Sequence, residues 1–280
     1  MSDFVQQNHT ICSFESDESW VILSPIEQSI KRKIEAVGTP LKDWDIQIYR
    51  GVLTGCNEAF IISTEKRDEI LANCQTASER SRTAELIRPI LRGRDIKRYG
   101  YDWAGLWLIA TFPACHYNIE DYLAVKNYLL SIGIERLEQT GKTHIVNGEK
   151  IKARKKTCHE WFETQDSISY WEDFYKPKIF YADITQDLNF CKCNEVMFCN
   201  NTTYFITSNS QNLPEHLITT LNSKLINWYY RTLSVQLGKN AIRMFSIYVL
   251  NIPIPKIIIG NIYETYNLSN EEIDFIEQKK

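Results

Sequence analysis

Residues 45–62 read DIQIYRGVLTGCNEAFII, and this stretch predicts a strand, a turn and a second strand. Over Asp45–Val52, isoleucines alternate with polar neighbours, which is typical of a half-buried strand. The segment Gly51–Asn57, with two glycines and an asparagine, favours a turn. Ala59–Ile62 then has the apolar character of the second strand. The sequence therefore predicts two strands near the start of the chain. The segments before and after them are expected to supply the helices that pack on these strands.

Helices are predicted on both sides of this stretch. Ser24-Pro25-Ile26-Glu27 forms a capping box with proline at the first helical position, and isoleucines repeat every four residues until Gly38. One apolar stripe of that helix is expected to pack inward. Two short helices are expected beyond the second strand, over about 64–74 and 79–91.

The rest of the chain continues to alternate strands, helices and loops. The prediction is a mixed α/β fold, with one mixed-sheet body and a helical C-terminal portion. Its divisions are an acidic segment over 1–19, the body over 20–210 and the helical portion over 211–280. The expected elements are strands near 95–103 and 105–112, a helix over about 119–139, a basic loop over 142–156, strands within 177–207 led by Lys178–Tyr181 and Thr203–Ile206, a helix from Pro214 to about 233, a break at Pro253 and Pro255, and a last helix capped by Ser269 and Glu272.

Composition excludes several classes of protein. The 280 residues are 44% hydrophobic and 24% charged, which is typical of a soluble globular protein and not of a collagen-like or disordered chain. No segment approaches the roughly 18–20 apolar residues that a membrane span needs, and no signal-peptide pattern is present, so we predict a cytoplasmic protein without membrane partners. The eight cysteines show no paired CxxC spacing, so no metal site is predicted.

Charge is distributed unevenly, although the net charge is only -3. Residues 1–18 hold four acidic side chains and no Lys or Arg, and residues 257–278 hold five acidic side chains and no basic one. Between them, residues 142–156 hold six basic side chains against Glu149, and residues 79–98 hold seven basic against three acidic ones. These two patches suit phosphate neutralisation, although a solvated lysine-rich loop would look the same.

Sequence signatures of catalysis are mostly absent. The chain has no GxGxxG, GxxxxGK[ST], HExxH or GxSxG pattern, so no catalytic residue is assigned. Cys115-His116 and Cys158-His159 are the two pairs that an unrecognised thiol enzyme would use. Neighbouring residues on a chain usually point apart, which disfavours both pairs.

Six segments, in order, resemble one known family: the TaqI-like C-terminal specificity domain, the target-recognition region of Type IIG restriction-modification enzymes and related adenine-specific DNA methyltransferases. The resemblance extends from about Trp20 to Glu277. The segments are GVLTGCNEAF (51–60), ILRGRDIKRY (90–99) with Trp103, KPKI (176–179), NTTYFI (201–206), LNSKL (221–225) and IPIPK (252–256).

The resemblance implies a DNA-reading module whose partners are double-stranded DNA and a methyltransferase or nuclease domain or subunit. Family members carry an Asn-Pro-Pro-Tyr motif that positions a flipped adenine, and that motif does not occur in these 280 residues. S-adenosylmethionine and Mg are therefore expected only in the catalytic part, with no cofactor in this chain. The chain alone is predicted to be non-catalytic and to direct adenine methylation or cleavage performed elsewhere.

Candidate DNA contacts lie on the turns and basic segments. Each has a structural alternative: Asn57 can bond its own backbone, Arg92 and Arg94 can pair with Asp95, and the two asparagines at 200 and 201 can form a turn instead of a bidentate adenine contact. The candidates are Thr54, Asn57, Arg92, Arg94, Lys97, Arg98, Lys150, Lys152, Arg154, Lys155, Lys156, Lys176, Lys178, Asn200 and Asn201.

Two other functions remain open at this point. A thiol enzyme built on the Cys/His pairs predicts a perturbed cysteine pKa. A protein-interaction module predicts that the helix over 214–233 and the acidic tail dock a methyltransferase or a phage-defence partner, with DNA contact secondary.

Overall fold

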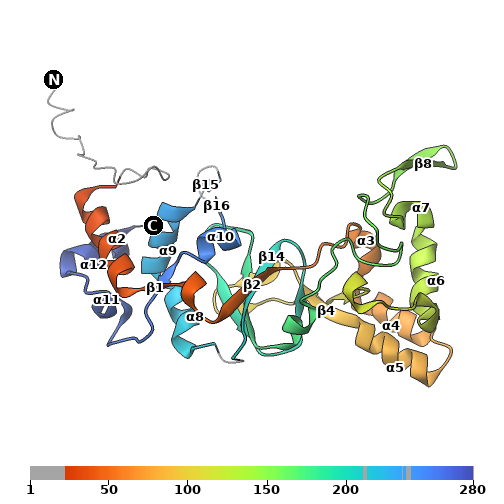
Figure 1. The fold of residues 1–280 in the computed structure, drawn as a ribbon, viewed down its shortest axis with the longest axis horizontal. Coiled ribbons are helices and arrows are strands. Elements are labelled where there is room, and N and C mark those ends of the chain that lie inside the picture. Colours follow the sequence, from red (N-terminus) through yellow and green to blue (C-terminus); the bar gives the residue numbers. More distant parts are fainter. Residues whose placement is uncertain (1–22, 211–212, 235, 238–240, 280) are drawn as a thin grey trace. The chain divides into compact units, whose positions relative to one another are not determined.

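The computed structural model describes residues 23–210, 213–234, 236–237 and 241–279, and it divides into two compact units. The first unit holds the residues up to Ile46, Thr185–Leu188 and the residues from Pro214 onward. The second holds Gln47–Ile184 and Asn189–Leu213. Each unit combines helices and strands (Figure 1), so the predicted mixed α/β class is confirmed. The acidic segment at 1–19 lies outside the described residues, and the functional division into 20–210 and 211–280 stays a prediction.

The first unit begins with the helix that the capping box predicts. Helix α2 (Pro25–Val37) starts after Ser24, whose backbone N–H donates to Glu27 Oε2 at 2.9 Å. Ile30 and Ile34 are fully buried, as the apolar stripe predicts. The helix ends at Gly38, where the sequence places its stop.

Helix α12 (Asn270–Gln278) is also capped as predicted, by Ser269 and Glu272. The Glu272 carboxylate lies 2.7 Å from Lys33 Nζ and accepts a hydrogen bond from Ser29 Oγ, which joins α12 to α2. The other elements of this unit are β1 (Thr39–Pro40), η1 (Leu41–Asp43), α8 (Glu215–Leu221), α9 (Lys224–Leu233), β15 (Gln236–Leu237), β16 (Ala241–Arg243), α10 (Ser246–Val249), β17 (Pro253–Ile254) and α11 (Ile262–Thr265).

Two predictions in this unit need correction. The single helix expected from Pro214 to about 233 is two helices, because Ser223 caps α9: its hydroxyl accepts from the backbone N–H of Ile226 at 3.2 Å. The segment with Pro253 and Pro255, where a break in regular structure was expected, contains a short strand. Pro253 and Ile254 form β17, which pairs antiparallel with β1.

The second unit contains two four-stranded sheets, ordered β12-β10-β14-β2 and β13-β4-β7-β3. Strands β10 and β14, both predicted, run antiparallel with Phe180 opposite Phe205. Three stacked or tilted phenylalanines pack together within the core, with ring centroids 4.3 Å apart for Phe174–Phe198 and 4.5 Å for Phe174–Phe205. The strands are β2 (Ile46–Arg50), β3 (Ile61–Ser63), β4 (Ile87–Leu91), β7 (Leu106–Ile109), β10 (Lys178–Ala182), β12 (Phe190–Cys193), β13 (Phe198–Cys199) and β14 (Thr203–Ser208).

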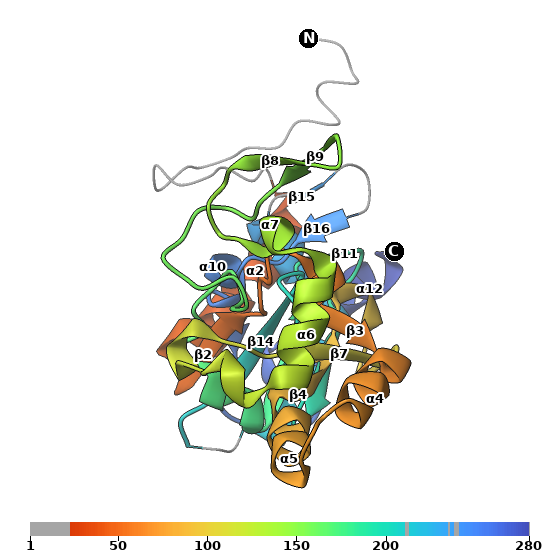
Figure 2. The ribbon, with the colours of Figure 1, turned by 90° about the vertical axis from the view of Figure 1, so that its right-hand side faces the viewer.

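Helices and short hairpins complete this unit, and Figure 2 shows α4, α5 and α6 beside the strands β3, β4 and β7. They are α3 (Asn57–Phe60), α4 (Thr64–Ala72), α5 (Ala77–Leu86), η2 (Gly93–Asp95), β5 (Ile96–Lys97), β6 (Gly100–Tyr101), η3 (Pro113–Cys115), η4 (Ile119–Asp121), α6 (Leu123–Ile132), α7 (Ile134–Leu137), β8 (Thr143–Val146), β9 (Glu149–Lys152), η5 (Trp171–Tyr175) and β11 (Ile184–Thr185), whose second residue belongs to the first unit.

Several local predictions in this unit were wrong. The second predicted strand starts late, because Asn57–Phe60 is helical and only Ile61–Ser63 is extended. The helix expected to reach residue 91 ends at Leu86, and the strand β4 replaces its last turn. The strands expected near 95–103 and 105–112 shrink to the short β5, β6 and β7.

The helix expected over 119–139 is three pieces, η4, α6 and α7. The expected helix is interrupted at Gly133, whose φ of 104° a helix cannot contain. The loop expected over 142–156 is a hairpin. In this hairpin, Asn147 and Gly148 both have positive φ between β8 and β9, as a two-residue hairpin turn requires. None of the helices in the described residues is long and apolar enough to cross a membrane.

Candidate nucleic-acid interface

Four separate segments of the second unit line one hollow of about 490 Å³. Three of the segments were selected from the sequence, and the strand end at 183–184 was not. The lining residues are Asn57, Arg92, Gly93, Arg94, Asp183, Ile184, Asn200 and Thr202. The fold thus brings together polar side chains that are more than 100 residues apart in the sequence.

Backbone contacts hold these segments close to one another. The N–H of Gly93 donates to Thr202 Oγ1, and the N–H of Asp183 donates to the Thr202 carbonyl, both at 2.9 Å. A Cβ at position 93 would lie 2.7 Å from that carbonyl oxygen, so only glycine fits without a shift. The Asn200 N–H donates to Leu91 O at 2.9 Å, which ties the end of β4 to the turn before β14.

Arg92 adopts the alternative that the sequence left open. Its Nε and Nη2 donate to the two Asp95 carboxylate oxygens at 3.0 and 2.8 Å, and its backbone N–H donates to the same group. Burial raises the pKa of Asp95, but the side-chain and backbone hydrogen bonds from Arg92 more than offset this, so the pKa lies below its ordinary value. Arg92 therefore braces the η2 turn through the Nε and Nη2 edge of its guanidinium.

Arg94 and Asn57 are the exposed candidates in the hollow. No described residue hydrogen bonds to the Arg94 guanidinium or pairs with it at ion-pair distance. The Thr54 hydroxyl donates to Asn57 Oδ1 at 2.8 Å, which leaves the amide N–H donors of Asn57 available to a ligand. Thr54 itself is buried, so it orients Asn57 and does not contact DNA in this conformation.

The sequence analysis missed Asp183, which is 9% exposed and directly follows the buried strand β10. Its Oδ1 is buried without a hydrogen-bond partner among the described residues. A polar residue immediately after a buried strand is the signal that would have selected it. Thr202 was missed as well, although it lies within the NTTYFI segment (201–206) that the family resemblance already covered.

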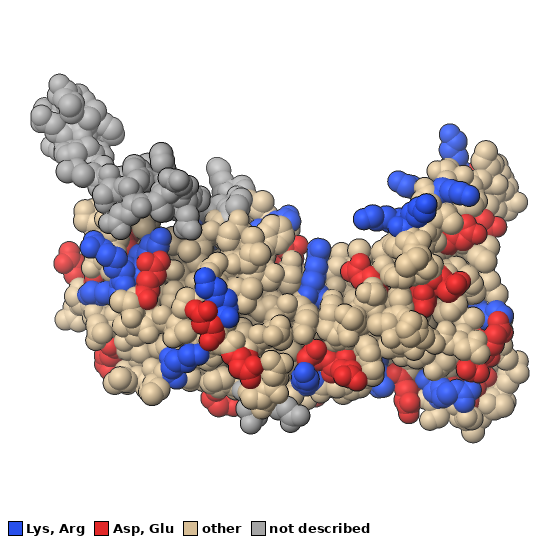
Figure 3. All heavy atoms as spheres, viewed as in Figure 1, with Lys and Arg blue, Asp and Glu red and all other residues tan. Residues whose placement is uncertain are grey.

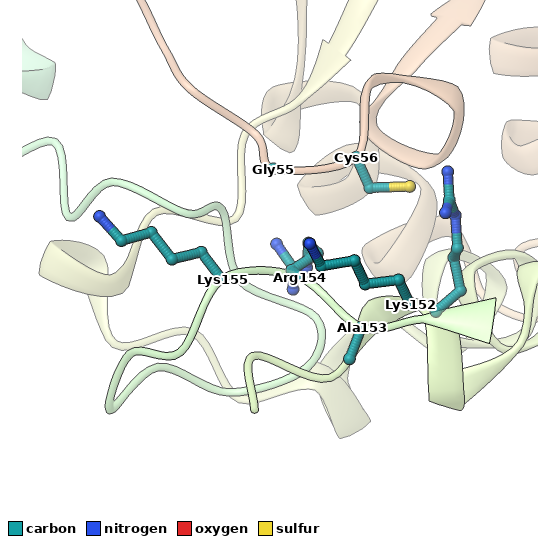
Figure 4. Close-up of a pocket in the computed structure, with 7 residues that line it drawn as sticks. Gly55, Cys56, Lys152, Ala153, Arg154 and Lys155 are labelled. Carbon is teal, nitrogen blue, oxygen red and sulfur yellow. The ribbon is translucent and has the colours of Figure 1, made fainter. Parts of the chain in front are cut away.

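A second, smaller hollow of about 240 Å³ lies beside the turn at 55–56 (Figure 4). Its lining residues are Gly55, Cys56, Arg136, Lys152, Ala153, Arg154 and Lys155. Figure 4 shows the Lys155 side chain directed away from that of Arg154, although the two residues are neighbours in the chain. Lys155 is exposed, whereas Arg154 is 4% exposed.

Arg154, which the sequence analysis placed among the phosphate contacts, is buried and does not face a ligand. Its guanidinium donates to four backbone carbonyls within 2.7–2.8 Å, and burial lowers its pKa to about 10. A guanidinium whose donors are used inside the protein cannot also hold a phosphate. The accepting carbonyls belong to Thr54, Leu137, Trp161 and Glu163.

The hairpin β8–β9 and the residues after it present a group of four exposed lysines. Lys150, Lys152, Lys155 and Lys156 are all exposed, and no described acidic side chain pairs with their ammonium groups. In Figure 3 blue side chains project from this hairpin. Exposed lysines that pair with no acidic side chain of the protein can neutralise phosphate groups.

The remaining candidates divide by burial. Lys178 is fully buried, its Nζ donates to Glu195 O at 2.9 Å, and burial lowers its pKa, so it is not a surface contact. Asn200 is 6% exposed and accepts from Thr202 Oγ1 at 2.6 Å, which is the turn alternative. Lys176 lies 2.6 Å from Asp173, Asn201 is half-buried, and Lys97 and Arg98 are exposed.

The thiol-enzyme alternative gains no support from geometry. No hydrogen bond joins Cys115 to His116 or Cys158 to His159 among the described residues. Burial raises the pKa of the Cys115 thiol, which is the opposite of what a nucleophile needs. No group of three or more His, Cys, Asp or Glu side chains in the described ranges is arranged to hold a metal ion.

Comparison with protein families matches residues 88–254, more than half of the chain, to the TaqI-like C-terminal specificity domain. The chain belongs to this family. The match includes the η2 turn, the hairpin and the strands β10 and β14. It confirms the family that the segments indicate, although the first segment (51–60) lies outside the matched residues. The specificity domain has no match among curated proteins.

The solved structures that are similar to this chain include two restriction enzymes. The type IIG restriction endonuclease BpuSI matches with a TM-score of 0.53 and 13% identity over 91% of this chain, and the match spans 28% of the BpuSI chain. The Type IIL restriction-modification enzyme MmeI, solved in complex with DNA, matches with a TM-score of 0.45 and 12% identity over 76% of this chain and 25% of that chain. At this identity the BpuSI likeness concerns the fold. The chain spans about a quarter of the length of these two enzymes.

Proposed function

We propose that this chain recognises a short sequence in double-stranded DNA and directs adenine methylation or cleavage by a catalytic domain or subunit outside it. One observation carries the proposal: in a chain of the specificity-domain family, Asn57, Arg94 and Asp183 line one hollow although they come from distant segments. Polar groups that converge in this way provide donors and acceptors for base edges.

The two basic and polar surfaces are suited to different tasks. The hollow contains a guanidinium, an amide and a carboxylate, a mixed set that suits base edges more than phosphates. The lysines of the hairpin carry only positive charge, which suits phosphates of any sequence. In this proposal the hairpin contributes affinity, and the hollow contributes discrimination.

The catalytic chemistry belongs to other residues. An adenine methyltransferase or nuclease part would supply the S-adenosylmethionine or Mg site, and the length of BpuSI beyond the matched region leaves room for such domains in that enzyme. The proposal for this chain is confined to choosing the site.

Selection from randomised duplex DNA tests the proposal. The intact chain is expected to enrich a short sequence over scrambled competitors at moderate salt. Arg94→Ala should lower the preference at one base pair by about 1–3 kcal/mol if Arg94 makes a bidentate guanine contact. The charge-matched control is Arg80→Ala, an exposed arginine on α5, which should leave the selected sequence unchanged.

Two results would contradict the proposal in different ways. Equal binding to all duplexes would show a non-specific binder or a protein-interaction module. If Arg94→Ala weakened every duplex evenly, the guanidinium would be a phosphate contact and the base reader would lie elsewhere.

A further inference from the structure

Asp183 is the one carboxylate among the described residues that line the larger hollow. It lies where β10 ends, with its backbone N–H held by the Thr202 carbonyl at 2.9 Å. The residue is 9% exposed, and no described group donates a hydrogen bond to either carboxylate oxygen. The backbone thus fixes the position of an acceptor that has no donor of its own.

The nearby cations do not satisfy this carboxylate. Arg92 is already engaged by Asp95 through Nε and Nη2. Arg94 lines the same hollow but makes no ion pair with Asp183. A buried carboxylate oxygen without a donor is costly, and a ligand that brings an N–H group would remove that cost.

The chemistry of the hollow limits what such a ligand can be. A carboxylate repels phosphate oxygens, so the hollow is a poor phosphate site. Among base edges in the major groove, the amino groups of cytosine and adenine are donors, but the adenine amino group lies beside the N7 acceptor, which also repels a carboxylate. The N4 amino group of cytosine has no acceptor on its own base edge in that groove.

We propose that Asp183 selects cytosine by accepting a hydrogen bond from its N4 amino group, while the Arg94 fork contacts O6 and N7 of the paired guanine. The pair of side chains would then read both bases of one C·G pair. This inference rests on the proposed function, because it assumes that the hollow faces the major groove.

The wild-type chain with modified DNA gives the most direct test. N4-methylcytosine still pairs with guanine but places a methyl group where the N4 proton faces the major groove. Introduced one position at a time into the selected duplex, it should lower affinity about 5- to 150-fold at one cytosine, the range of a good base contact. With Asp183→Ala, that methyl group should have little effect, because the acceptor is gone.

Two variants and a control separate readout from folding. Asp183→Ala should weaken the preference for cytosine at that position alone, because Arg94 still contacts the paired guanine. Asp183→Asn conserves volume and carries an amide suited to adenine N6 and N7, so together with Arg94→Ala it should shift the preference toward adenine. Glu172→Ala removes the same charge from an exposed position on η5 and should leave the selected sequence unchanged. Denaturation midpoints identify any variant that fails to fold. If Asp183→Ala does not fold, the binding of Asp183→Asn to the modified duplexes tests the role of Asp183.

The outcomes distinguish the two proposals. If the wild-type chain enriches no sequence, the proposed function fails and this inference fails with it. If it enriches a sequence that contains no cytosine sensitive to N4-methylation, or one whose sensitivity persists in both Asp183 variants, only the role of Asp183 is overturned.

Discussion

At the scale of single residues, Arg154 shows how burial changes the role of a basic side chain. Its four carbonyl acceptors lie on three stretches of the second unit: the turn at Thr54, the end of α7 and the segment at 161–163. Since Thr54 orients Asn57 through its hydroxyl, the guanidinium holds the turn that presents Asn57 to the hollow. Arg154 thus acts on the candidate site through another residue.

Arg154→Met is expected to lower the free energy of unfolding by about 3 kcal/mol or more, because several buried carbonyls lose their donor. Lys155→Met is the matched control: it removes the same charge one residue further on from an exposed side chain and should change stability by no more than about 0.5 kcal/mol. Chemical denaturation with both variants measures the difference. Equal stability of the two variants would mean that the carbonyls find other donors.

At the scale of elements, the hairpin β8–β9 gives the basic segment a defined shape. Its four-residue strands pair from Thr143 opposite Lys152 to Val146 opposite Glu149. Pairing places Lys150 and Lys152 on a two-stranded ribbon and not on an irregular loop. Such a ribbon holds its charges in a fixed pattern that can follow a nucleic acid backbone.

The combined substitution of Lys150, Lys152 and Lys156 by Ala should weaken binding to all duplexes alike. The slope of log affinity against log salt should fall by about 0.9 for each phosphate that the variant no longer neutralises. A charge-matched triple variant at Lys66, Arg80 and Lys126, on α4, α5 and α6, should leave the slope nearly unchanged. Titrations at several salt concentrations measure both, and an unchanged slope in the hairpin variant would show that these lysines are only solvated.

At the scale of the whole molecule, the family match extends across residues of both units. It ends at Ile254, within β17 of the first unit, and includes most of the hollow and the whole hairpin of the second. The region that matches the specificity-domain family is therefore not confined to the unit that contains the candidate interface. A transfer of specificity should accordingly use both units together.

Replacing the corresponding region of a related methyltransferase with this chain should redirect methylation to a new short site, while the modified base remains adenine. The reason is the division of labour in the proposed function: the catalytic part acts on the base, and this chain chooses the position. Sequencing of methylated positions in the host of the chimera gives the result. A chimera carrying Arg94→Ala serves as the control and should relax the new site at one base pair.

An active chimera that still modified the original site would show that these residues do not specify sequence. An inactive chimera would be resolved by testing the parent enzyme under the same conditions and by measuring whether the chimeric protein is folded.

Local signals in the sequence were sufficient for particular elements. The capping boxes at Ser24 and Ser269 predicted the starts of α2 and α12, because a cap depends on residues only three apart. The β-branched and aromatic runs predicted β10 and β14. The hairpin was also available locally, since Asn147-Gly148 is a strong two-residue turn signal, and the interpretation as a basic loop overlooked it.

Tertiary structure alone decided which basic residues are available to a ligand. Arg154 and Lys155 are adjacent and equally basic in the sequence, yet one is buried under four carbonyls and the other is exposed. Residue patterns were enough to predict the mixed α/β class, the capped helices and the family. They did not determine the hollow around Asp183, because burial and convergence depend on contacts between segments that are distant along the chain, and no local pattern of residue types encodes those contacts.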